Sequence, residues 1–96
     1  MATAVMSASP AHVVRDALFA IARVEQVFVS SSTDGGISVL TVVGDRDYAV
    51  QKQIFRTEAE IIHSLPGIEV GFELVIRDGR PLDQLISPRG TLLFAR

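Results

Sequence analysis

Cysteine is absent from the 96-residue sequence, and so is any apolar run near the roughly 20 residues that a membrane span requires. The missing thiols exclude disulfide bonds, cysteine-ligated zinc and thiol catalysis. A chain without disulfides suits a reducing compartment. We therefore expect a cytoplasmic protein that makes no contact with a membrane.

Basic residues are not in excess either. Nine lysine and arginine residues stand against eleven aspartate and glutamate residues, which gives a formal net charge of −2. The basic residues are also scattered along the chain, whereas proteins that neutralise phosphates cluster them. No nucleic-acid partner is predicted.

The chain is long enough for one domain with its own hydrophobic core. Residues 1–9 contain no basic segment and only a short apolar run, so they do not resemble a signal peptide. We expect a disordered leader over residues 1–9 and a single domain over residues 10–96.

Two helices are predicted from apolar periodicity. Ser9 is a suitable N-cap and Pro10 is tolerated in the first turn, which favours a helix over residues 10–23. Asp45 or Asp47 caps a second helix that ends near Leu65. The second helix has an apolar stripe, with further apolar residues beside it. The stripe is Val50, Ile54, Ile61 and Leu65, and the residues beside it are Phe55, Ala59 and Ile62.

The strands are predicted from β-branched and alternating segments. Residues 25–31 (EQVFVSS) and 37–43 (ISVLTVV) form a hairpin around the turn Thr33-Asp34-Gly35-Gly36. Residues 68–77 alternate apolar and polar side chains, which is typical of a strand with one buried face. The remaining elements are a helical turn at residues 82–86, a turn at 87–90 and a short strand at 91–95.

This α-β-β-α-β order, with a possible C-terminal strand, predicts the α+β class. Because a chain of this length cannot cover both sides of a sheet, we expect a two-layer sandwich. Both helices would then lie on one face of a three- to four-stranded mixed sheet.

The uncovered face of that sheet predicts self-association. The hairpin strands carry apolar residues in both alternating registers, so branched side chains stay outside whichever register faces the helices. An apolar area with a charged rim is typical of an interface. We therefore predict a homodimer or another protein partner; the alternative is that the C-terminal segment covers part of this face. The predicted interface residues are Val27, Val29, Leu40, Val42 and Glu73.

The Ser- and Gly-rich hairpin turn is a second candidate site, for a small anion or nucleotide. Its predicted ligands are Ser31, Ser32, Gly35, Gly36 and Arg46. A Walker-type loop would need a lysine after the glycines, and this loop has none. The same residues are explained equally by the chemistry of a tight turn.

Catalytic and metal-binding patterns are weak. His12 and His63 lie on separate helices without an acidic neighbour, and the serines have no surrounding nucleophile-elbow motif. A metal-dependent enzyme using Asp34, Asp45 and Asp47 is a third hypothesis, although the last two also suit a helix cap. The sequence favours a non-enzymatic role, and no catalytic residue, metal ligand or cofactor is predicted.

The segments "VFVSSSTDGGISVLTVV", "IEVGFELVIRDG" and "SPRGTLLFAR", in this order over residues 10–96, resemble a small nucleotidyltransferase-fold domain. That resemblance implies a Gly-Ser loop and a pair of metal-binding aspartates. Ser30 and Ser31 stand at the loop position without a preceding glycine, and the aspartate positions fall at Ser38 and Leu40. The resemblance therefore implies a domain that has lost its active site.

Overall fold

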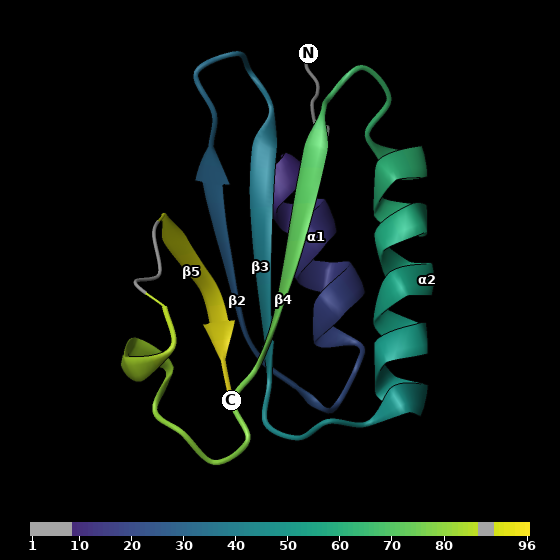
Figure 1. Ribbon diagram of the computed structural model, residues 1–96. Helices are drawn as coiled ribbons and strands as arrows, with labels where there is room; N and C mark the ends of the chain where they lie inside the picture. The colour runs from purple at the N-terminus through teal and green to yellow at the C-terminus, as the bar shows by residue number, and fades with distance from the viewer. Residues whose placement is uncertain (1–8, 87–89) are drawn as a thin grey trace.

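The structure, a computed structural model, describes residues 9–86 and 90–96 (Figure 1). It confirms the predicted α+β class, with two helices against a four-stranded mixed sheet. The predicted leader, except for Ser9, and the turn residues 87–89 lie outside the described residues. No helix in the described part of the chain is long and apolar enough to cross a membrane.

The elements follow the predicted order. They are α1 (Pro10–Phe19), β2 (Val24–Ser31), β3 (Ile37–Val43), α2 (Tyr48–Ser64), β4 (Val70–Ile76), the 3-10 turn η1 (Leu82–Gln84) and β5 (Thr91–Ala95). The strand order in the sheet is β4-β3-β2-β5. Strand β2 is antiparallel to both of its neighbours, and β3 is parallel to β4. The parallel pair requires a crossover, which α2 provides.

Both helices begin at the predicted caps. The Ser9 hydroxyl accepts a hydrogen bond from the His12 amide at 3.3 Å, and the Asp47 carboxylate accepts one from the Val50 amide at 3.2 Å. Helix α1 ends at Phe19, earlier than the predicted residue 23. Residues 20–23 instead form a tight turn, because the chain must reverse to enter β2.

The pairing of the strands decides which side chains face the helices. Val27 lies opposite Thr41 of β3 and Phe94 of β5, and Thr41 lies beside Leu74 of β4. Paired residues project to the same side of the sheet. Because Val27 and Thr41 are fully buried, this row is the one that faces the helices. Apart from the buried Thr41 and Thr57, the core formed there is apolar: Val14, Leu18, Ile21, Val24, Val27, Val39, Val43, Ile54, Ile61 and Leu65.

This register places the predicted interface residues on two different faces. Val27 is fully buried in the core and Val29 packs against it, so neither belongs to the open sheet face. Leu40, Val42 and Glu73 do face the open side, because they lie in rows with Phe28 or Gln26. Val42 is nevertheless fully buried. The open face therefore offers fewer accessible apolar side chains than the sequence suggested, and dimerisation through it stays a prediction.

Candidate functional site

The hairpin loop between β2 and β3 is held by hydrogen bonds among its own residues. The Asp34 carboxylate accepts hydrogen bonds from the Ser32 hydroxyl and, at 3.3 Å, from the Gly36 amide. The Ser32 amide donates to the Gly36 carbonyl at 2.9 Å, and Gly35 adopts a φ of 90°. That φ lies in the left-handed region, which glycine adopts without a steric cost.

These bonds determine the electrostatics of the loop. The Ser32 hydroxyl, followed by the Gly36 amide, holds the pKa of Asp34 below its usual range. The loop groups that would hold an anion thus already solvate a carboxylate of the chain itself. A second negative charge would be repelled, so the loop has the chemistry of a turn.

The structure does not bring the predicted anion ligands together. Ser31, Ser32, Gly35 and Gly36 lie at one end of β3, whereas Arg46 follows its other end. A strand of this length separates its ends by about 20 Å. Arg46 instead lies 3.8 Å from the Asp78 carboxylate.

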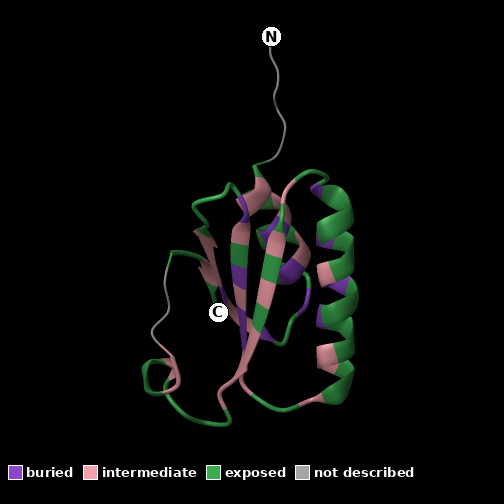
Figure 2. Cartoon of the chain, turned by 45° about the horizontal axis from the view of Figure 1, so that its top comes forward, coloured by how far each residue is buried: buried purple, intermediate pink, exposed green. Residues whose placement is uncertain are grey.

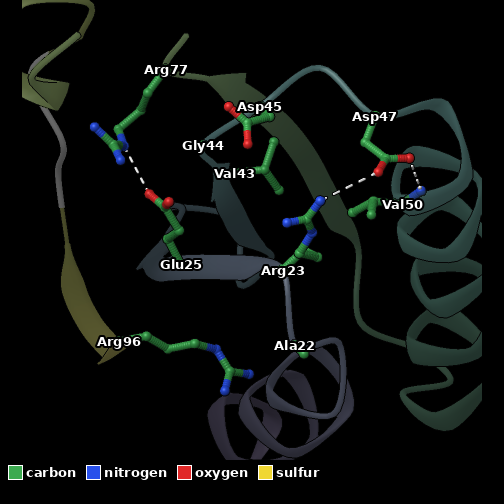
Figure 3. Close-up of a pocket in the computed structure, with 10 residues that line it drawn as sticks. All are labelled: Ala22, Arg23, Glu25, Val43, Gly44, Asp45, Asp47, Val50, Arg77 and Arg96. Carbon is green, nitrogen blue, oxygen red and sulfur yellow. Dashed lines mark hydrogen bonds and ion pairs between the residues drawn. The ribbon is translucent and has the colours of Figure 1, made fainter. Parts of the chain in front are cut away.

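The opposite end of the sheet contains a cavity of about 340 Å³ (Figure 3). It lies at the carboxyl ends of the parallel strands β3 and β4, a common place for ligands in α/β sheets. Backbone and side chains from β2, β3, α2 and the chain end meet there. The lining residues are Ala22, Arg23, Glu25, Val43, Gly44, Asp45, Asp47, Val50, Arg77 and Arg96.

One ion pair across this cavity joins β2 to the residue that follows β4. The Arg77 Nε atom donates to the Glu25 carboxylate at 2.8 Å, and this bond raises the pKa of Arg77. Glu25 is the extra residue where the β2 register shifts against β3. A Cβ at Gly44 would lie 2.5 Å from the second oxygen of Glu25, so glycine leaves room for the pair.

Two more arginines of the cavity are also engaged. Arg23 lies 3.7 Å from the Asp47 carboxylate, which caps α2. Arg96 donates to backbone carbonyls of the segment that follows α1, including Val24 at 2.7 Å and Ile21 at 3.2 Å. Three arginines and three carboxylates line the cavity, so it has no surplus positive charge to attract a phosphate.

The described residues also contain no group of three histidine, cysteine, aspartate or glutamate side chains placed to hold a metal ion. His12 bonds to the Ser9 hydroxyl at 3.2 Å, and His63 lies in the last turn of α2. Of the acidic residues in the third hypothesis, Asp34 and Asp47 serve their own loop and helix cap, and they lie at opposite ends of β3.

The outer face of α2 is the feature that sequence reasoning missed. Tyr48, Phe55 and Ile62 are 75%, 53% and 49% exposed, and Figure 2 shows exposed residues along the side of α2 turned away from the sheet. The sequence interpretation placed Phe55 and Ile62 beside the buried stripe. The signal was available, because the three residues are spaced seven apart, which keeps them on one line of a helix.

Comparisons of the chain with protein-family models, curated proteins and solved structures find no match. The resemblance to the nucleotidyltransferase fold therefore stays a prediction.

Proposed function

We propose that this chain is a non-catalytic protein-interaction domain that self-associates as a homodimer, and that the outer face of α2 is its interface. The observation that carries the proposal is the line of exposed apolar side chains at Tyr48, Phe55 and Ile62. Large apolar side chains that share one face and lie outside the core are typical of an interaction surface.

The exposed apolar side chains are concentrated on this helix. Within residues 9–86 and 90–96, five large apolar residues are exposed, and three of them belong to α2. The other two, Phe19 and Leu92, lie on α1 and β5. Aromatic residues bury roughly 150–250 Å² each at an interface, so Tyr48 and Phe55 would dominate the association energy.

The polar groups support a non-catalytic role. The three arginines of the cavity are engaged with Glu25, Asp47 or backbone groups, and the loop serine bonds to Asp34. Catalysis needs a nucleophile or base next to a partner that activates it. The bonds of these arginines, of their carboxylate partners and of the loop serine stabilise the fold instead.

Mass measured against protein concentration tests the proposal. Light scattering coupled to size-exclusion chromatography should show a shift from 10.4 kDa towards twice that mass as the wild-type protein is concentrated. Phe55→Ser combined with Ile62→Ser should stay monomeric over the same range. Far-ultraviolet circular dichroism should be unchanged, because both side chains lie outside the core.

Leu92→Ser is the matched control, since it removes an exposed apolar side chain from β5 rather than from α2. The control should dimerise like the wild type. A wild-type protein that stays monomeric at high concentration would refute self-association. A Phe55→Ser, Ile62→Ser protein that still dimerises would place the interface elsewhere.

A further inference from the structure

We infer that the two copies pair through α2 in antiparallel orientation, with Phe55 of each copy packed beside Ala59 of the other. The inference rests on the proposed function and specifies its geometry. Helix α2 has 17 residues. A helix of that length measures about 25 Å, which is long enough to align several layers of side chains.

The spacing of the outer residues forms a single seam. Tyr48, Lys52, Phe55, Ala59 and Ile62 alternate between steps of four and three residues, the spacing of a helix-pairing stripe. The Lys52 ammonium lies 5.5 Å from the centre of the Tyr48 ring, so its aliphatic stem extends the apolar surface.

Size complementarity favours the antiparallel arrangement. Ala59 is the small residue of the seam, and beside it lies a shallow depression of about 500 Å³, lined by Arg56, Ala59, Glu60, His63 and Ser64. Antiparallel pairing sets Phe55 of one helix against Ala59 of the other, twice, by the two-fold axis. Parallel pairing would set Phe55 against Phe55 and leave the space beside Ala59 empty.

Charge order favours the same arrangement. Lys52 lies in the first half of α2, Arg56 is its central residue, and Glu58 and Glu60 lie in the second half. Antiparallel pairing places Lys52 of one helix along the half of the other that contains Glu58 and Glu60, whereas parallel pairing places Lys52 beside Lys52.

The two-fold axis also predicts one specific pair. Arg56 and Glu60 line the same side of the seam, since both border the depression beside Ala59. In an antiparallel dimer, residues on one side of the seam meet residues on the same side of the second copy. Arg56 of each copy therefore lies near Glu60 of the other, and the two Glu60 carboxylates flank the two Arg56 side chains that meet at the axis.

Charge reversal tests this pair. Arg56→Glu and Glu60→Arg should each weaken the homodimer several-fold, because each creates two like-charged contacts across the axis. An equimolar mixture of the two variants should restore association, because both contacts of the mixed dimer again join opposite charges. Sedimentation equilibrium of each variant and of the mixture measures the effect. A mixture no stronger than the separate variants would overturn the antiparallel assignment.

Cysteine cross-linking gives a second test that does not depend on charge. The chain has no natural cysteine, so Lys52→Cys and Ile62→Cys introduce the only thiols. Antiparallel pairing brings position 52 of one copy to position 62 of the other, and a disulfide forms only between close Cα atoms. Oxidation of the mixed variants should thus give the 52–62 disulfide.

Disulfides joining 62 to 62 and 52 to 52 would show parallel pairing and overturn the inference. A dimer by mass that forms none of these cross-links would place the interface off the α2 seam, which also overturns it, while self-association would stand. A wild-type monomer would refute the proposed function itself. The two failures are therefore distinguishable.

Discussion

Phe19 on α1 and Phe55 on α2 expose similar fractions of their side chains, yet their surroundings differ. The Phe19 ring meets Phe94 edge to face at 5.1 Å between centroids, and the Arg96 guanidinium lies 4.3 Å from its centre. Phe55 projects from the middle of the outer face of α2. The chain thus supplies partners for one surface aromatic, whereas the other is the centre of the proposed interface.

The difference shows that exposure alone does not identify an interface. Arg96 covers Phe19 while its guanidinium bonds to the carbonyls of Phe19, Ile21 and Val24 at the end of α1. Arg96 thus supplies hydrogen-bond donors to the carbonyls at the end of α1 and also covers the face of the Phe19 ring. Within the described contacts no residue near the C-terminus reaches the outer face of α2 in this way, and Tyr48, Phe55 and Ile62 stay exposed there.

The largest expected effect comes from the buried side chain next to Phe19. Leu18 is fully buried between α1 and the sheet, so Leu18→Ala should lower the free energy of unfolding by about 2–5 kcal/mol. Urea denaturation followed by circular dichroism measures this loss. Asp16→Ala, at an exposed position of the same helix, is the control and should change little. A loss near zero would contradict the placement of α1 on the core.

A smaller effect is expected when Arg96 is removed, which makes Phe19 resemble Phe55. Arg96→Ala deletes hydrogen bonds to three carbonyls and a cation–π contact, so it should lower the free energy of unfolding by about 1–3 kcal/mol. Arg96→Lys keeps the charge without the forked geometry and should recover only part of the loss. Urea denaturation at one fixed protein concentration makes the comparison.

The proposed self-association should respond differently to the removal of Arg96. Because the hydrogen bonds of the Arg96 side chain go to carbonyls at the end of α1 and the start of β2 and not to the α2 seam, the Arg96→Ala protein should keep the wild-type dependence of mass on concentration. A loss of dimerisation equal to that of Phe55→Ser, Ile62→Ser would remove the distinction between the two aromatic sites.

Local elements were predictable from the sequence because their determinants are local. The caps at Ser9 and Asp47, the strand at residues 37–43 and the alternation in β4 all depend on neighbouring residues. The end of α1 was not predictable from the sequence, because the turn at residues 20–23 depends on where β2 joins the sheet.

The face of each hairpin strand could not be predicted for a different reason. Val27 and Phe28 are both apolar, so the alternation of β2 does not distinguish inside from outside. The pairing of Val27 with Thr41 and Phe94 decides it, and the partner Phe94 is distant in sequence. Arg46 lies away from the hairpin turn for a local reason, because the length of β3 separates them.

The smallest expected effect concerns the polar border of the α2 seam. Burial raises the pKa of Glu58, so the folded chain protonates this carboxyl more readily than the unfolded chain does. Its negative charge therefore costs stability at pH 7. The cost fades as the pH falls through the raised pKa, and it is absent below the ordinary value of 4.5.

Glu58→Gln should accordingly be more stable than the parent protein at pH 7, by a few tenths of a kcal/mol because solvent screens a partly exposed group. The gain should disappear near pH 4. Urea denaturation in the Phe55→Ser, Ile62→Ser background keeps self-association out of the measurement, and Glu60→Gln is the matched control for the loss of one charge from α2. An equal gain for Glu58→Gln at both pH values would show that the gain does not come from removing a buried charge. The Glu58 carboxylate beside the seam would then not be partly desolvated.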